Sequence, residues 1–86
     1  MCRNITTLRG LEPIATGEEI EAAARQYVRK ITGVQKTSAA TEAAFERAVA
    51  IIATASTRVL HELPPRKAVP KSEPPLRRIA RAQAQA

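Results

Sequence analysis

The feature that most limits the fold is a long stretch without helix-breaking residues. From Ser38 to Leu63 the sequence contains no glycine and no proline, and Pro64–Pro65 follows immediately. Apolar side chains recur at helical spacing within it: Phe45, Ala48, Val49, Ile52, Ala55, Val59, Leu60 and Leu63. This spacing places them on one face of a helix, and proline cannot continue a helix. The pattern predicts one long helix that begins after Ser38 or Thr41 as N-cap and ends at about Leu63.

An earlier segment carries a complete set of helix start and stop signals. Thr16 and Glu19 have the spacing of a capping box, in which each side chain bonds the other residue's backbone N–H. Gly33 is placed to end the helix in a left-handed conformation. The apolar positions between them form a single stripe: Ile20, Ala23, Ala24, Tyr27, Val28 and Ile31. These signals predict a helix over residues 17–32 that buries the stripe, with Tyr27 in the core.

The short loop between the two predicted helices requires them to lie antiparallel. The second helix is longer, so part of its apolar face needs another cover. The spacing of Ile5, Leu8 and Leu11 predicts a short N-terminal helix, which is one candidate cover, and a second copy of the protein is the other. The predicted fold class is all-α: a short N-terminal helix and an antiparallel helical hairpin, followed by a Pro-rich basic C-terminal tail.

The chain is expected to divide at the proline pair. Residues 1–63, the predicted hairpin domain, carry eight basic and seven acidic side chains, whereas residues 64–86 carry six basic and one acidic. Most of the net charge of +6 therefore lies in the tail. Five prolines between Pro64 and Pro75 favour an extended, semi-rigid segment. Residues 76–86 favour a short helix, which is marginal in isolation and would order on a partner.

Few residues suited to catalysis or metal binding are present. The sequence has one cysteine, Cys2, one histidine and no aspartate, so a Ser-His-Asp set, a cysteine–histidine metal set and an internal disulfide are all excluded. Cys2 stands beside Arg3 and is a candidate reactive thiol. We predict that the protein is not an enzyme and has no cofactor, no bound metal and no small-molecule substrate.

Basic side chains are the candidate partner contacts. They are Arg25, Arg29 and Lys30 on the first predicted helix and Arg66, Lys67, Lys71, Arg77, Arg78 and Arg81 in the tail. The preferred interpretation is a non-enzymatic accessory subunit that binds an unidentified protein partner or forms a homo-oligomer. One alternative is an RNA- or DNA-associated protein, for instance at the ribosome, that binds nucleic acid through the tail. The other is a small thiol-dependent enzyme using Cys2.

The sequence shows no feature of export or membrane insertion. It has no recognisable signal peptide and no apolar run of the roughly 20 residues that a membrane span requires. We therefore expect a cytoplasmic location.

Several sequence segments resemble a small bacterial family catalogued as domain of unknown function 2277. They are the opening Met1–Ile5, Glu12–Pro13, Ala15–Thr16, Glu18–Ile20, Ala22–Ala23, Gln26–Lys30 and Glu42–Val49. The resemblance covers about residues 1–63, and the tail looks more variable. It implies no assigned activity, ligand or catalytic residue.

Two segments are also similar to parts of the J-domain. Leu8 to Tyr27 is similar to its first helices and Ala43 to Leu60 to its long return helix. This resemblance implies a similar hairpin with a docking role. The His-Pro-Asp tripeptide with which J-domains stimulate their chaperone ATPase is absent from Gly33–Ser38, which argues against co-chaperone activity.

Overall fold

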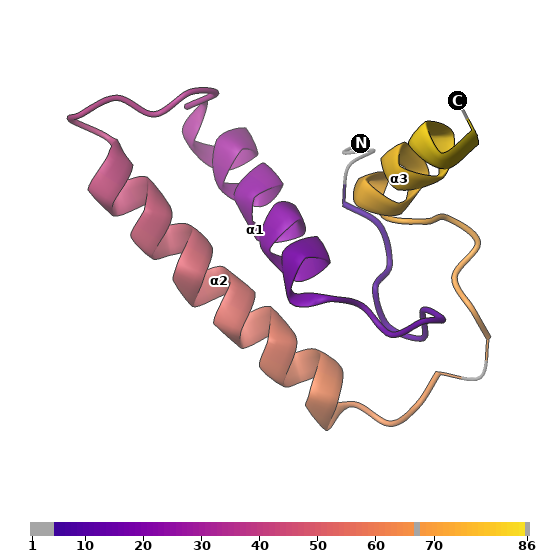
Figure 1. The fold of residues 1–86 in the computed structure, drawn as a ribbon. Coiled ribbons are helices and arrows are strands. Elements are labelled where there is room, and N and C mark those ends of the chain that lie inside the picture. The colour runs from indigo at the N-terminus through magenta and orange to yellow at the C-terminus, as the bar shows by residue number, and fades with distance from the viewer. Residues whose placement is uncertain (1–4, 67, 86) are drawn as a thin grey trace.

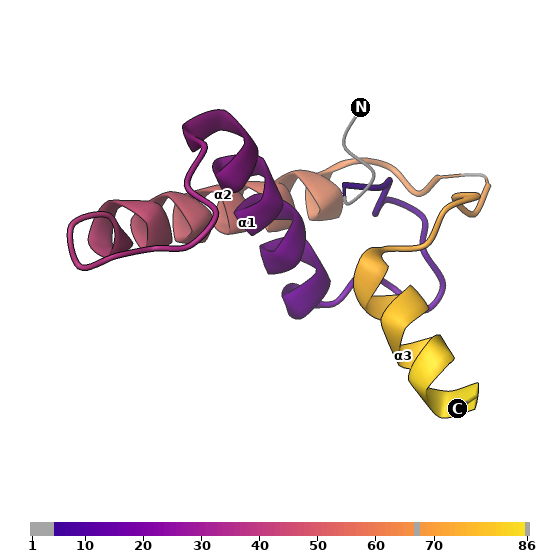
Figure 2. The ribbon, with the colours of Figure 1, turned by 90° about the horizontal axis from the view of Figure 1, so that it is seen from above.

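The computed structural model describes residues 5–66 and 68–85, and this part of the chain contains three helices and no strand (Figure 1). Helix α1 spans Gly17–Thr32, α2 spans Glu42–Glu62 and α3 spans Pro75–Gln85. The predicted all-α class is confirmed. α1 and α2 form a helical hairpin and cross each other, and α3 lies beside the N-terminal end of α1 (Figure 2).

Helix α1 begins and ends where its sequence signals predict. The Thr16 hydroxyl accepts a hydrogen bond from the Glu19 N–H at 3.1 Å, and the Glu19 carboxylate accepts one from the Thr16 N–H at 2.8 Å. At the other end Gly33 adopts φ +73°, and its N–H donates to the Arg29 carbonyl. The capping box and the glycine stop are therefore both confirmed, and they satisfy backbone groups that a helix end otherwise leaves without partners.

Helix α2 begins after one of the two predicted N-cap residues, but its cap has a different chemistry. Thr41 occupies the N-cap position, yet its hydroxyl accepts from the Ser38 N–H at 2.8 Å and makes no bond to the helix. The Ser38 carbonyl instead accepts from the N–H groups of Thr41 and Glu42 at 3.1 and 2.9 Å. The helix stops at Leu63, whose backbone is extended, as the following prolines require.

The core between α1 and α2 is small. Its buried side chains are Ala24, Val28, Phe45 and Val49. The prediction that Tyr27 and Ile31 belong to this core is wrong, since they are 46% and 63% exposed. Crossing helices touch along only part of their lengths, so α2 covers a narrower strip of α1 than a parallel pairing would (Figure 2).

The predicted short N-terminal helix does not form in residues 5–16. This segment is irregular, with a single turn in which the Leu11 N–H approaches the Leu8 carbonyl at 3.4 Å. Gly10 has φ +86°, and a Cβ atom there would lie 3.0 Å from the Cβ of Arg66. The close passage of the tail and the left-handed backbone at Gly10 are incompatible with a continuous helix. Leu11 is nevertheless buried, and it lines a pocket with Leu60 near the end of α2.

The tail returns to the hairpin. The Arg9 guanidinium donates two hydrogen bonds to the Pro64 carbonyl, at 3.1 and 2.6 Å. The described residues between Pro64 and Pro74 form no helix, as their proline content predicts, and Pro74 is buried. The predicted terminal helix is present as α3, and it is ordered against the chain's own N-terminal half (Figures 1 and 2).

Candidate interaction surfaces

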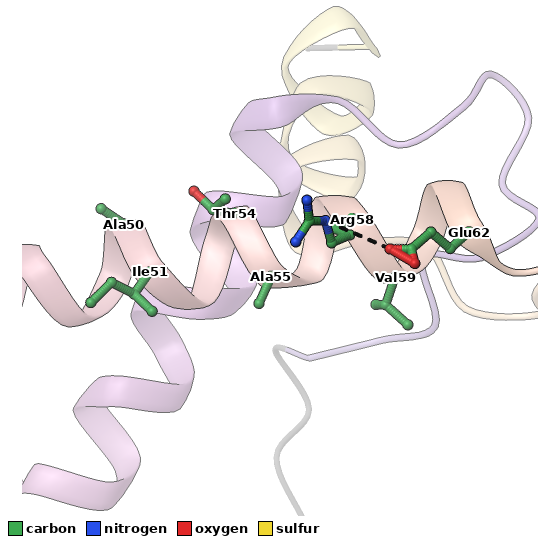
Figure 3. A pocket seen from close by; sticks show the side chains of 7 residues that line it. All are labelled: Ala50, Ile51, Thr54, Ala55, Arg58, Val59 and Glu62. Atoms are coloured by element: carbon green, nitrogen blue, oxygen red, sulfur yellow. Dashed lines mark ion pairs between the residues drawn. The ribbon is translucent and has the colours of Figure 1, made fainter.

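One side of α2 has no covering element in the described part of the chain. Figure 3 shows the side chains that project from it, which are Ala50, Ile51, Thr54, Ala55, Arg58, Val59 and Glu62. They border a shallow depression of about 630 Å³. Ile51 is 62% exposed and Val59 is 48% exposed, so the surface, here called the outer face of α2, is apolar at its centre.

The outer face could be predicted from Ile51, an apolar residue that lies outside the apolar stripe of this helix. Ile51 and Ile52 are adjacent, and neighbouring residues of a helix point in directions about 100° apart. Ile52 packs against the core, which turns Ile51 towards solvent. Ala55 and Val59 lie on the predicted apolar face, part of which was expected to lack a cover from the first helix, and both are exposed.

Charged side chains lie at both ends of the outer face. Arg47 is exposed one turn before Ile51. Arg58 and Glu62 form an ion pair at 3.6 Å, and their side chains are 81% and 65% exposed. An exposed ion pair of this kind adds little stability, so Arg58 or Glu62 can leave the pair at little cost and contact another molecule instead. The apolar centre is therefore bracketed by a positive and a negative group.

Arg25, a predicted partner contact, is engaged inside the hairpin. Its guanidinium donates to both carboxylate oxygens of Glu46 at 2.7 and 2.8 Å and to Glu21 at 3.2 Å. It also stands 5.8 Å from the centre of the Phe45 ring. The hydrogen bonds between Arg25 and Glu46 raise the pKa of Arg25 and lower the pKa of Glu46. Arg25 thus ties α1 to α2.

Arg77, a predicted contact of the tail, anchors α3 to the start of α1. Its guanidinium donates to the two Glu19 oxygens at 2.6 and 3.0 Å and to the carbonyls of Pro13 and Ile14 at 2.6 and 3.2 Å. Only 5% of the Glu19 side chain and 16% of the Arg77 side chain are exposed. Burial alone would raise the pKa of Glu19, but hydrogen bonds from Arg77 and Thr16 outweigh it, and the pKa is lowered. Sequence reasoning gave Glu19 only its capping role.

The remaining predicted contacts occupy different surroundings. Arg81 forms an ion pair with Glu73. Arg29 is half-buried on α1 and Lys30 beside it is exposed. The other three, Arg66, Lys71 and Arg78, are exposed and take part in no ion pair among the described residues. They line a single cleft of about 630 Å³ between the N-terminal segment and the tail.

Two of the predicted residues, Cys2 and Lys67, lie outside the described residues. Within residues 5–66 and 68–85, no three histidine, cysteine or acidic side chains gather as a metal site would require. The helices of this same part of the chain lack the combination of length and apolarity needed to cross a membrane.

The fold and its surfaces define a small all-α protein, a crossed helical hairpin with a basic tail folded back on it. The chain belongs to a family of uncharacterized conserved proteins, DUF2277, whose model matches residues 1–84. The predicted family is confirmed, and the match extends through most of the tail, beyond the expected 1–63. Neither the curated proteins nor the solved structures gave a match. The resemblance to the J-domain stays a prediction.

Proposed function

We propose that this protein is a non-catalytic, cytoplasmic interaction protein, and that the outer face of α2 docks onto the same face of a second copy. The observation that supports this most is the exposed apolar centre around Ile51 and Val59. A chain of this size buries a small core and is marginally stable alone, so association commonly supplies part of the missing burial. Ala50 and Ala55 beside the two larger side chains would let a second helix approach closely.

The charges on the outer face are self-complementary in one arrangement. In a dimer with two-fold symmetry, every contact between two different residues occurs twice. For antiparallel α2 helices with the axis between Thr54 and Ala55, Arg47 of each copy lies opposite Glu62 of the other. Two ion pairs then close the ends of the interface. A parallel pairing would place Arg47 against Arg47 and lose this complementarity.

The same arrangement matches apolar groups at the centre. Ala50 of each copy lies opposite Val59 of the other, and Ile51 lies opposite the aliphatic stem of Arg58. An arginine stem can cover apolar surface while its guanidinium stays in water. The exposed ion pair of Arg58 and Glu62 leaves both groups accessible for this exchange.

Light scattering after size exclusion, across a range of protein concentrations, tests the proposal on the full chain. We expect a dimer that Ile51→Lys converts to a monomer, because the new ammonium would lie opposite Arg58 of the other copy. Losing one buried isoleucine costs about 2 kcal/mol in each copy, so the dissociation constant should rise at least about a hundredfold. Ile31→Lys is the matched control, because Ile31 is 63% exposed and Ile51 is 62% exposed. A monomeric wild-type chain, or equal effects of the two variants, would contradict the proposal.

Charge reversal tests the antiparallel register separately. Arg47→Glu and Glu62→Arg should each weaken the dimer, because each places like charges opposite one another at both ends. Combining them should restore dimerisation, since the reversed pairs attract again. A double variant weaker than both single variants would rule out this register.

A further inference from the structure

The cleft between the N-terminal segment and the tail gathers groups that bind anions. Three cations line it, Arg66, Lys71 and Arg78, together with the hydroxyl side chains Thr6, Thr7 and Ser72. No acidic side chain is among the described residues that line it. The site is separate from the outer face of α2 and shares no residue with it.

Two of the three cations are positioned by the folded chain, Arg66 directly and Arg78 through its neighbour. The stem of Arg66 packs over Gly10, with its Cβ and Cδ atoms 3.0 and 3.2 Å from where a glycine Cβ would stand. Arg78 follows Arg77, whose bonds to Glu19 fix the first turn of α3. Lys71 directly follows Pro70 in the segment that connects Arg66 to α3. A cation whose stem is already packed, such as Arg66, loses less side-chain freedom when a ligand binds.

The positive charge in the cleft has no internal counter-charge among the described residues. The neighbouring arginines of α3, Arg77 and Arg81, both have carboxylate partners, whereas the three cleft cations have none there. Thr6, which also lines the cleft, has no hydrogen-bond partner for its buried Oγ1 atom among the described residues.

We infer that this cleft binds the phosphate backbone of a nucleic-acid strand, each of its three cations contacting one phosphate. Guanidinium, ammonium and hydroxyl groups are the side chains that most often hold such phosphates. The chain carries a net charge of +6, which adds long-range attraction to a polyanion. Binding is independent of base sequence, because Phe45 is buried and Tyr27 lies on α1, so the cleft has no aromatic ring for stacking.

Anionic membranes are a poorer match for the same cations. Firm attachment to a bilayer needs a broad apolar helix face, and the large apolar residues of α3 are only Leu76 and Ile79. The lining of the cleft is concave and mixes Ile5 and Val69 with the cations, which fits a sugar-phosphate unit entering between two segments.

Fluorescence anisotropy of the full chain with a labelled single-stranded RNA, repeated with duplex DNA, tests this site. If each of the three cations neutralises one phosphate of a single strand, the slope of log affinity against log salt concentration should be about −2, a roughly 20-fold loss between about 50 and 200 mM salt. The triple variant Arg66→Gln, Lys71→Gln, Arg78→Gln should weaken binding at least tenfold at low salt and flatten the slope. Arg78→Gln alone should flatten it by about a third.

The matched control removes the same charge from the hairpin by Arg29→Gln, Lys30→Gln and Lys36→Gln. It should keep the wild-type slope and most of the affinity, and both triple variants should keep the wild-type circular dichroism. Equal losses in the two triple variants would show attraction by net charge alone and would overturn the proposal. Absence of wild-type binding to either nucleic acid, or binding to phosphatidylglycerol vesicles in its place, would overturn it as well.

Discussion

The hairpin and the tail are held together by different interactions. α1 and α2 share the buried side chains of Val28, Phe45 and Val49, and ion pairs only reinforce them. The tail has no comparable apolar core in the described residues, and it is attached mainly through Arg9 to the Pro64 carbonyl and Arg77 to Glu19. Apolar burial depends weakly on pH and salt, whereas ion pairs depend on both. The difference predicts that the tail can detach while the hairpin stays folded.

The largest effect should come from removing the one aromatic ring of the hairpin core. Phe45→Ala deletes a side chain that is 5% exposed and leaves a cavity between α1 and α2. Such changes cost about 3–5 kcal/mol, which is most of the stability of a domain this small. Urea denaturation followed by circular dichroism should show loss of the hairpin and of α3 together. If α3 stayed ordered without the hairpin, the proposed dependence of the tail on α1 would be wrong.

A smaller and more local effect is expected when the anchor of the tail is removed. Arg77→Ala leaves Glu19 buried without its partner and should cost about 1–3 kcal/mol. Hydrogen exchange should rise over residues 75–85 with little change in α2. Arg78→Ala, one residue further along α3, removes an arginine without an ion pair in the described residues and should leave exchange in α3 unchanged. Equal exchange in the two variants would argue against the anchor.

The attachment of the tail should also weaken in acid. The pKa of Glu19 is lowered in the folded chain from its ordinary value of 4.5, so the folded state binds the proton less readily than the unfolded state. The contribution of Glu19 is therefore complete above that ordinary pKa and is lost as the pH falls through the lowered one. Amide NMR signals of α3 should report detachment in this range. In Glu19→Gln this pH dependence should disappear, and its persistence would assign it to another group.

The smallest effect is expected from the ion pair inside the hairpin. Arg25→Met removes the bonds to Glu46 and Glu21 but keeps an apolar stem over Phe45. Because these carboxylates are largely solvated, the change should lower the urea midpoint of the hairpin only slightly. Far-UV circular dichroism, which reports mainly α1 and α2, checks this; a large fall in the midpoint would mean that ion pairs also hold the hairpin.

Local signals in the sequence predicted the helices well. Helix ends depend on local interactions, so they can be predicted without knowing the fold. The examples are the capping box at Thr16, the stop at Gly33 and the prolines after Leu63. The helix expected after Pro75 was found for the same reason.

Contacts between distant residues were not predictable in the same way. Glu19 and Arg77 are 58 positions apart, and no local pattern joins them. The left-handed backbone of Gly10 under Arg66, which replaced the predicted N-terminal helix, is a similar case. The outer face of α2 could have been found from the adjacent Ile51 and Ile52, because a helix cannot bury both against a single neighbour.

Cysteine crosslinking at the proposed two-fold axis tests the central claim most directly. In a Cys2→Ser background, Thr54→Cys should bring two thiols together across antiparallel α2 helices, within the roughly 4.4–6.8 Å Cα separation that a disulfide spans. Mild oxidation should then yield a covalent dimer, and Thr32→Cys at the far end of α1 should not. Failure of Thr54→Cys to crosslink, or equally rapid crosslinking of both variants, would contradict self-association through the outer face of α2.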